Sequence, residues 1–329
     1  MKSKTIKKAL KAKLQSWMKS IEDESVRELV KKNTIVTGGS IASMLLQEKV
    51  NDYDVYFKNK ETVMAVAQYY VKKFNDDNPN RKTKIGTDGK AYILDCDDRR
   101  QVEAERQECG GGNHRLGAGH LLNLNPGRVK IVVRSDGVAS ARPDLLKEPI
   151  ENAVEAIDEV SPEDLDSLEE QKYKPIFLSS NAITLSGRLQ IVVRFYGEPD
   201  KIHETYDFVH CTNYYDLGED KLVLKAEALE CLLTKELKYT GSKYPLCSII
   251  RTRKFIQRGF TVNAGQYLKM CMQLNELELT DLAVLEDQLV GVDSAYFMQL
   301  ISALQSKMSS EPGFTLDQTY VGSIIDKIF

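Results

Sequence analysis

Two glycines between a short apolar run and a pair of aspartates constrain this chain more than any other pattern in it. The run is Thr34–Thr37, the turn is Gly38-Gly39-Ser40, and eleven residues separate the turn from Asp52 and Asp54. We predict a strand, a sharp turn, a short helix and a second strand over 53–57. Because alternate strand positions share a face, Asp52 and Asp54 should lie about 6–7 Å apart on one side of the sheet.

This local geometry suits phosphate and metal chemistry. Gly38 and Gly39 allow a tight backbone turn. The first helical turn, at Ser40, offers unpaired N–H groups and a partial positive charge to a phosphate. Two neighbouring carboxylates are ligands that Mg²⁺ or Mn²⁺ accepts. The pattern therefore predicts metal-assisted phosphoryl or nucleotidyl transfer; the alternative is a glycine turn beside two surface aspartates.

A third carboxylate on a later strand would complete such a site. Asp207 lies between aromatic residues in a predicted strand over 204–211, and Asp95 ends a predicted strand over 91–95. Spacing alone leaves both open, because insertions can separate strands that are neighbours in a sheet.

The glycine–aspartate pattern resembles that of the DNA polymerase β-type nucleotidyltransferase superfamily. Residues 205–221, which contain Asp207, and 244–260 are similar to segments of class II tRNA nucleotidyltransferases (CCA-adding enzymes) and bacterial poly(A) polymerases. The chain also resembles a group of phage-encoded nucleotidyltransferases. Together these similarities cover about half of the chain.

The resemblance implies a set of roles. Asp207 becomes the better third acid, so that Asp52, Asp54 and Asp207 hold Mg²⁺ or Mn²⁺. Residues 38–40 hold the phosphates of an NTP, and the acceptor is an RNA 3′ end, tRNA first.

The chain departs from the family at several points. Ile41 and Ala42 stand where the family has Arg-Asp after its glycines, and Thr205 and Tyr206 replace a pair of arginines. The base-reading site corresponds to residues 243–248, which contain no acid. Two alternatives therefore stay open: transfer to a protein or small-molecule acceptor, and an inactive nucleotidyltransferase scaffold that binds a partner.

A basic helix face follows downstream. Arg251, Lys254 and Arg258 lie at i, i+3 and i+7, so they share one face of a predicted helix. They could bind a triphosphate or an RNA backbone. The alternative is an ordinary solvated helix face.

Periodicity predicts an α/β (α+β) region followed by an all-α region, and the resemblance implies that the first is a nucleotidyltransferase head with a mixed sheet. We place the head at residues 1–240, with an insertion over 98–172 that carries a glycine-rich loop and an acidic segment, and the helical region at 241–329. A lysine-rich helix over 5–31 opens the chain, either as a plain cover for the sheet or as a phosphate-binding face. Another helix is predicted over 222–238.

Other features point away from alternative classes. The 329 residues carry a formal charge of −3, which argues against a protein that coats nucleic acid. No apolar run is long enough for a membrane span, and scattered cysteines indicate reduced thiols, so we expect a cytoplasmic protein. Cys96, Cys109, His114 and His120 form a weak zinc candidate. His210 and Cys211, as neighbours in a predicted strand, should point apart.

Overall fold

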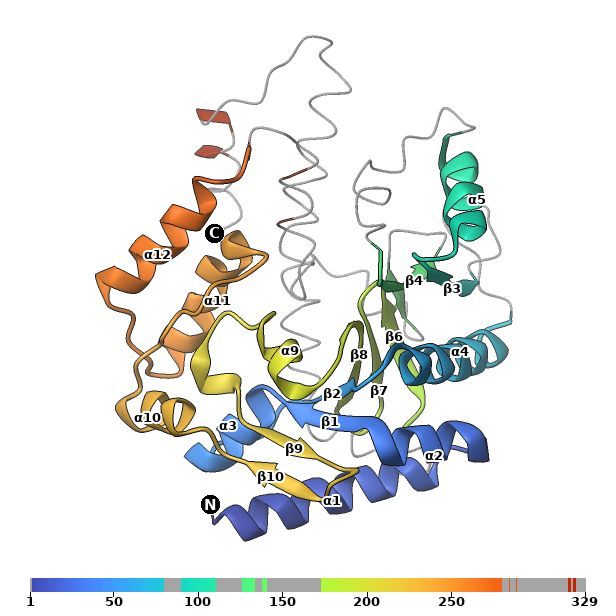
Figure 1. Cartoon of the computed structure of the whole chain (residues 1–329), viewed down its shortest axis with the longest axis horizontal. Helices are drawn as coiled ribbons and strands as arrows, with labels where there is room; N and C mark the ends of the chain where they lie inside the picture. The colour runs from blue at the N-terminus through green and yellow to red at the C-terminus, as the bar shows by residue number, and fades with distance from the viewer. Residues whose placement is uncertain are drawn as a thin grey trace.

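The centre of the structure is a mixed sheet of eight strands (Figure 1). The computed structural model describes residues 2–79, 90–110, 126–133, 138–140 and 173–279, with a few residues at 284, 288, 319–320 and 322–323. The strands are β1 (Thr34–Thr37), β2 (Tyr53–Phe57), β5 (Val138–Ser140), β6 (Pro175–Ser179), β7 (Ala182–Leu185), β8 (Leu189–Tyr196), β9 (Tyr214–Asp216) and β10 (Lys221–Val223). Their order is β10-β9-β1-β2-β8-β7-β6-β5. Within the described residues, β2 and β8 are the parallel pair, and the other neighbours run antiparallel.

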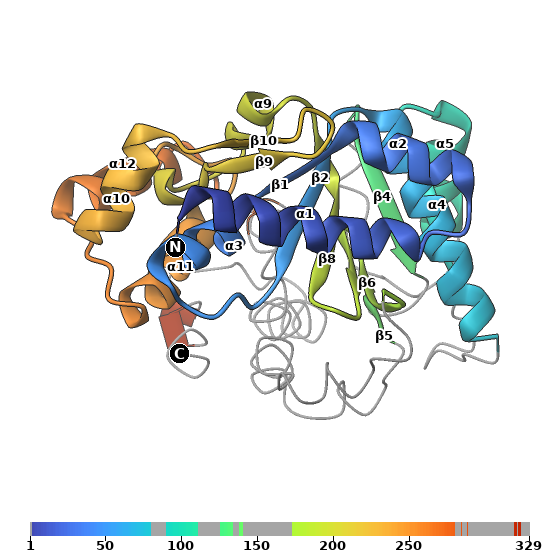
Figure 2. The same cartoon turned by 90° about the horizontal axis from the view of Figure 1, so that it is seen from below.

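Three helices cover one face of this sheet: α1 (Ser3–Lys19), α2 (Glu24–Asn33) and α4 (Lys60–Asp77). Figure 2 shows α1 lying across the strands. Their apolar residues recur at helical spacing and are buried against inward-facing strand residues such as Val55 and Val193. Trp17 of α1 donates a buried hydrogen bond of 2.7 Å to the hydroxyl of Tyr70 in α4. This packing fixes the helical layer and leaves the other face of β1 and β2 for the site.

The predicted helix over 5–31 is two helices. Asp23 caps α2, because its carboxylate accepts hydrogen bonds from the N–H groups of Ser25 and Val26. The apolar residues on both sides of Asp23 are buried in the same core, so their helical spacing continues across the break and predicts a single helix. On α1, Lys7 and Lys11 form ion pairs with Asp220, which uses part of the basic face to hold the loop between β9 and β10.

The other helices of this part of the structure are α3 (Gly39–Leu46), α9 (Pro199–His203), the 3₁₀ helix η3 (Val209–Cys211), α10 (Ala226–Thr234), α11 (Pro245–Gln257) and α12 (Ala264–Leu274). An apolar cluster joins α3, α10, α11 and α12, with Phe208 and Leu232 on one side of the predicted boundary at 240 and Phe260 and Met270 on the other. The head with a mixed sheet and the helical region after it are therefore confirmed, and they share a core.

Two predicted elements are wrong. Residues 204–211 are not a strand: the chain leaves α9 in a turn and enters η3. Residues 222–238 are not one helix, since Lys221–Val223 forms the edge strand β10 before α10 begins.

A strand of the predicted insertion pairs with the strand predicted over 91–95 to form a second, two-stranded sheet. Its strands are β3 (Ala91–Asp95) and β4 (Val129–Val133), and α5 (Arg99–Gly110) follows β3. The acidic segment and most of the glycine-rich loop lie outside the described residues, as do His114 and His120 of the zinc candidate. None of the described helices is long and apolar enough to cross a membrane.

Candidate active site

The turn after β1 has a backbone conformation that depends on glycine. Gly38 has φ 95° and ψ −150°, a region that side-chain-bearing residues avoid. Its N–H donates to the carbonyl of Cys211 over 3.1 Å. A Cβ at Gly38 would lie 2.7 Å from Oδ2 of Asp54, whereas a Cβ at Gly39 would meet nothing within 4 Å. Gly38 is thus the point where the turn touches an aspartate of β2.

Asp52 and Asp54 converge on one amide. β8 runs parallel to β2, and Gln190 lies directly opposite Asp54 in the register. With its amide nitrogen facing the carboxylates, Gln190 donates to Asp54 Oδ1 over 3.1 Å and to Asp52 Oδ2 over 3.3 Å. The predicted shared face of the two aspartates is therefore present. It lies at the end of β2 next to the Gly38 turn.

The first turn of α3 continues this corner. Ser40 is 1% exposed, and its Oγ makes no hydrogen bond. Helix N-termini leave N–H groups without intrahelical partners. A buried hydroxyl beside such a terminus is a donor that an anion could use.

Below the turn, a hydrogen-bond chain fixes the end of β1. Thr37 donates to the carbonyl of Asn213, and its Oγ1 lies 2.9 Å from Nε2 of His203. Lys225 lies 3.1 Å from Nδ1 of the same ring. Burial, together with Lys225, lowers the pKa of His203 to about 4. The ring is therefore neutral near pH 7, with Nε2–H donating to Thr37 and Nδ1 accepting from Lys225.

Aromatic hydroxyls line the same face. Tyr56 follows Asp54 by two residues on β2, and Tyr206 packs against it with ring centroids 6.2 Å apart. Burial raises the pKa of both hydroxyls, and the charge of Asp54 adds to the effect. Both phenols stay protonated and can act as hydrogen-bond donors beside Asp54.

Asp207 does not occupy a strand. It lies in the turn between α9 and η3, where Arg251 of α11 approaches its Oδ2 to 2.6 Å. Within the part of the chain that the structure describes, no three His, Cys, Asp or Glu residues form a group that could hold a metal ion. Asp52, Asp54 and Asp207 are thus not such a group among the described residues, and Asp207 is paired with Arg251. Its role as the third acid stays a prediction.

Asp95, the competing third acid, is also engaged elsewhere. It ends β3 in the second sheet, where Lys60 approaches its Oδ1 to 2.6 Å. Lys60 begins α4, which follows the C-terminal end of β2, whereas Asp52 precedes the N-terminal end of that strand. The ion pair of Lys60 and Asp95 therefore lies at the other end of β2 from Asp52.

The cations of α11 do not form one free face. Arg258 donates to Glu48 and to Ser43 Oγ, which lie at the end of α3, and Lys235 also approaches Glu48, to 3.0 Å. Burial alone would raise the pKa of Glu48, but its hydrogen bonds to Arg258 and Lys235 hold it below its ordinary value. Arg251 is paired with Asp207, and the side chain of Lys254 is exposed. Arg251 and Arg258 thus bind α11 to the elements of the site.

His210 and Cys211 contact each other, contrary to the prediction. Both belong to η3, and Sγ of Cys211 lies 3.1 Å from Nε2 of His210. Burial raises the pKa of the thiol and lowers that of His210 to about 4. A protonated thiol beside a neutral ring is not an activated nucleophile.

The donor set at Asp52, Asp54 and Gln190 fits a hard divalent cation. Two carboxylates and an amide oxygen are ligands of the kind that Mg²⁺ prefers, with water or phosphate oxygens completing its shell. The sequence analysis missed Gln190, although one signal was present: it is the polar residue inside the apolar run Leu189–Val193.

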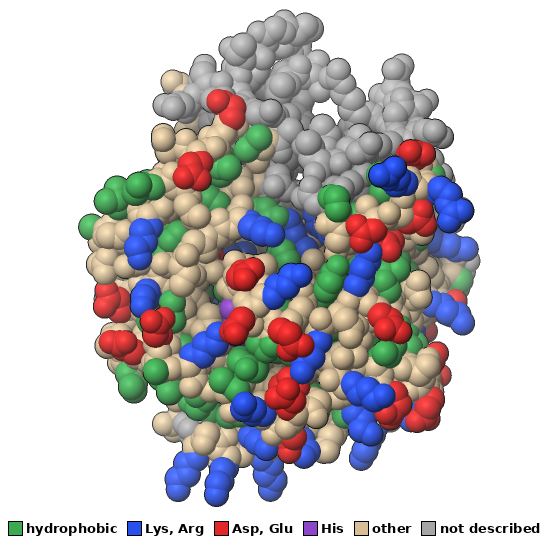
Figure 3. All heavy atoms as spheres, in the orientation of Figure 1, with side chains coloured by type: hydrophobic (Ala, Val, Ile, Leu, Met, Phe, Trp, Pro, Cys, Tyr) green, Lys and Arg blue, Asp and Glu red, His purple; other side chains and the backbone are tan. Residues whose placement is uncertain are grey.

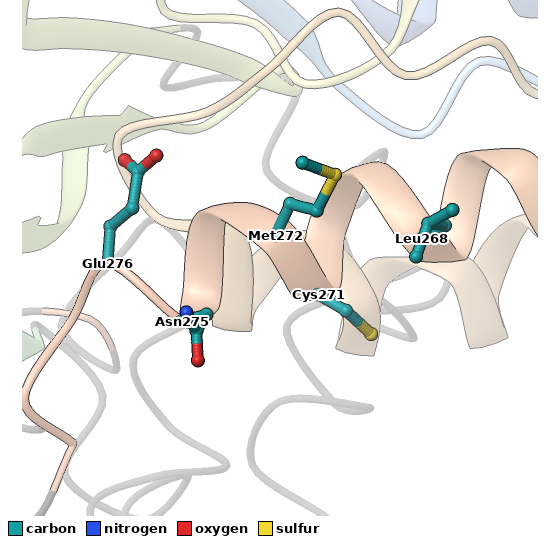
Figure 4. A pocket seen from close by; sticks show the side chains of 5 residues that line it. All are labelled: Leu268, Cys271, Met272, Asn275 and Glu276. Carbon is teal, nitrogen blue, oxygen red and sulfur yellow. The ribbon is translucent and has the colours of Figure 1, made fainter.

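The structure has an apolar hollow on α12, away from this corner. It is lined by Leu268, Cys271, Met272, Asn275 and Glu276 (Figure 4). None of these residues belongs to an element that carries Asp52, Asp54 or Gln190.

Comparisons with known proteins give one family and two individual matches. The model of a family described as "Gabija anti-defense 2 family protein" matches residues 8–235. The protein "Gabija anti-defense 2" of Bacillus phage SPbetaL7 is 22% identical over 107 residues, which are 32% of this chain and 27% of that protein. The match thus spans about a quarter of the length of the phage protein.

Among solved structures, a CCA-adding enzyme of Thermotoga maritima in complex with tRNA matches with 13% identity and a TM-score of 0.36. The match covers 93% of this chain and 57% of that one.

Proposed function

The chain belongs to the Gabija anti-defense 2 family, and we propose that it counters Gabija defense as a metal-dependent nucleotidyltransferase. One observation carries the proposal. Asp52 and Asp54 converge beside a glycine turn that opens a helix, and Gly38 touches Asp54 so closely that no side chain fits between them. This arrangement brings a phosphate-binding corner and two metal ligands to the same edge of the sheet.

The roles follow from the chemistry of each group. The N–H groups at Gly39 and Ser40, with the buried Ser40 hydroxyl, bind the β- and γ-phosphates of an NTP. Asp52 and Asp54 would hold Mg²⁺ or Mn²⁺, which would supply charge stabilisation for the transferred phosphoryl group and the leaving pyrophosphate. The hydroxyls of Tyr56 and Tyr206, whose pKa is raised by burial and by the charge of Asp54, stay protonated and lie beside Asp54 as hydrogen-bond donors.

The acceptor hydroxyl attacks the α-phosphorus of the NTP. The bond between the α-phosphorus and its bridging oxygen breaks, and pyrophosphate leaves. The acceptor keeps the nucleotidyl group, and its proton passes to a carboxylate or to water. Arg251 neutralises Asp207, and Arg258 holds the end of α3, so both act on the shape of the site.

For the acceptor we favour a protein hydroxyl over an RNA 3′ end. Residues 243–248, which correspond to the base-reading site of tRNA nucleotidyltransferases, contain no acid. On the face in Figure 3, acidic and basic side chains are intermixed rather than arranged in an unbroken basic band. The RNA acceptor remains the alternative that the sequence resemblance supports.

Label transfer tests the proposal. Purified protein is incubated with Mn²⁺ or Mg²⁺ and each α-labelled NTP, with total RNA, with extract of bacteria that carry Gabija, and alone. An Asp52→Asn/Asp54→Asn variant should lose the label. A control variant, Asp76→Asn/Asp77→Asn, changes two exposed acids at the end of α4 by the same charge and should keep it.

The outcomes separate the acceptors and connect the chemistry to defense. Label on protein supports the favoured acceptor, and label on RNA supports the alternative. A phage plated on Gabija-bearing cells should be protected by the wild-type chain and by the control variant, but not by the Asp52/Asp54 variant. If the Asp52/Asp54 variant protects fully, the anti-defense function does not depend on this chemistry and the proposal fails.

A further inference from the structure

Gln190 occupies the position on the neighbouring strand that is closest to both aspartates. β8 is the parallel neighbour of β2, and the Cα of Gln190 is registered with that of Asp54. Its neighbours along the strand, Leu189 and Ile191, are fully buried in the core under the helices. The strand thus turns one polar side chain toward the site, at the level of the two carboxylates.

The amide nitrogen of Gln190 has one hydrogen-bond donor for each of the two carboxylates that it contacts. An NH₂ group has two donors, and here one reaches Asp54 over 3.1 Å and the other reaches Asp52 over 3.3 Å. Two carboxylates this close repel each other unless something positive lies between them. The amide supplies that partial positive charge while adding no net charge of its own.

We propose that Gln190 is the third ligand-bearing residue of the site and that its neutral amide sets the affinity for the divalent cation. This rests on the proposed function, because it assigns Gln190 to the same metal site. Without a cation, the amide nitrogen bridges the carboxylates. With one, the amide turns about its last side-chain bond and offers its oxygen to the ion.

A neutral third ligand has a consequence for binding strength. Two carboxylates and an amide just balance a divalent charge, whereas three carboxylates would exceed it by one. Coulomb attraction therefore makes a carboxylate at position 190 the stronger ligand. The same carboxylate would destabilise the cation-free protein, since three negative charges would then converge.

Gln190→Glu separates these effects, and no catalytic turnover is needed to see them. Mn²⁺ binding is measured by electron paramagnetic resonance of the free ion, and thermal unfolding is followed with and without Mn²⁺. We expect Gln190→Glu to bind Mn²⁺ at least tenfold more tightly than the wild type. It should also unfold at a lower temperature without the ion and gain more from its addition.

Two further variants keep the test sharp if Gln190→Glu folds poorly. Gln190→Leu keeps the size but removes donor and acceptor, so it should weaken Mn²⁺ binding and lower the unfolding temperature without metal. Gln68→Glu makes the same charge change on an exposed position of α4, under the opposite face of the sheet, and should alter neither quantity.

The inference and the proposed function fail in different ways. If the wild type binds Mn²⁺ and Asp54→Asn abolishes binding, but Gln190→Glu and Gln190→Leu bind as the wild type does, Gln190 is not a ligand and the inference is overturned. If the wild type binds no Mn²⁺ at millimolar concentrations, both are overturned. Tighter binding by Gln190→Glu with no label transfer in any arm supports the metal site and refutes the enzymatic function.

Discussion

Replacing Gly38 by alanine tests the geometry of the site at its tightest point. The residue has φ 95° and ψ −150°. Holding a residue with a side chain in such a region costs about 1–3 kcal/mol. The new Cβ would also lie 2.7 Å from Oδ2 of Asp54, where ordinary contacts begin at 3.4 Å. Either Asp54 or the turn must therefore move by about 0.7 Å, the difference between these two distances.

That displacement exceeds what a preorganised site tolerates. Functional groups have to stay within about 0.5 Å of their productive positions, and a misplacement of about 1 Å can lower a rate by about 100-fold. We expect Gly38→Ala to lose about 1–3 kcal/mol in free energy of unfolding and to weaken Mn²⁺ binding by about tenfold or more. Equilibrium urea unfolding and Mn²⁺ titration measure the two effects separately.

Gly39→Ala is the matched control. A Cβ at Gly39 meets nothing within 4 Å, and the residue begins α3. Alanine favours a helix over glycine by up to about 1 kcal/mol, so the variant should be as stable as the wild type or slightly more so. If Gly38→Ala binds Mn²⁺ like the wild type, or if Gly39→Ala is equally damaged, the close approach of the turn to Asp54 is not what shapes the site.

Three other perturbations test the surroundings of the turn. The pKa of His203 falls from 6.5 to about 4 on folding. As the pH drops from 6.5 toward 4, the unfolded chain therefore binds a proton on His203 before the folded protein does, and the free energy of unfolding decreases. His203→Gln should flatten this part of the pH dependence, measured by urea unfolding at a series of pH values. Arg251→Ala leaves the carboxylate of Asp207, only 13% exposed, without its cation, and should lower the free energy of unfolding by about 3 kcal/mol. Adding Asp207→Asn should restore part of this loss in a double-mutant cycle, and strictly additive losses would contradict the coupling. Asp54→Asn removes a repulsion as well as a ligand, so it should unfold no earlier than the wild type yet show no Mn²⁺-dependent rise in unfolding temperature; a retained rise would place the metal elsewhere.

The first half of the site could be predicted because its signals are local. Glycines, a helix start and alternating strand residues all lie within 34–57, and the structure places β1, α3 and β2 there. The same locality explains the error at 204–211. Aromatic residues alternate in that stretch, but its backbone groups bond elsewhere: the carbonyl of Cys211 accepts from Gly38, and the N–H of Val209 donates to Lys238. Tertiary contacts, which the local pattern does not contain, decide the conformation.

The third position of the site could not be predicted for a related reason. Asp207 and Asp95 were candidates because they are acids, and a search for acids passes over an amide. Gln190 enters the site through the parallel pairing of β2 and β8, two strands that are separated by residues 58–188 of the chain. Its signal, one polar residue in the apolar run 189–193, becomes meaningful only when the register places it opposite Asp54.

The ion pairs that Arg251 and Arg258 each form with an acid show how the helical region acts on the site. As a sequence, α11 presents cations at helical spacing, which suits a free phosphate-binding face. In the structure Arg258 donates to Ser43 and Glu48 at the end of α3, the helix that Gly38 opens, and Arg251 holds Asp207. The N-terminus of α3 is the proposed phosphate corner, and the C-terminal end of the same helix is held by Arg258. The helical region thereby acts on the site through the orientation of α3, and changes at this junction should alter the turn even where no α11 residue contacts a ligand.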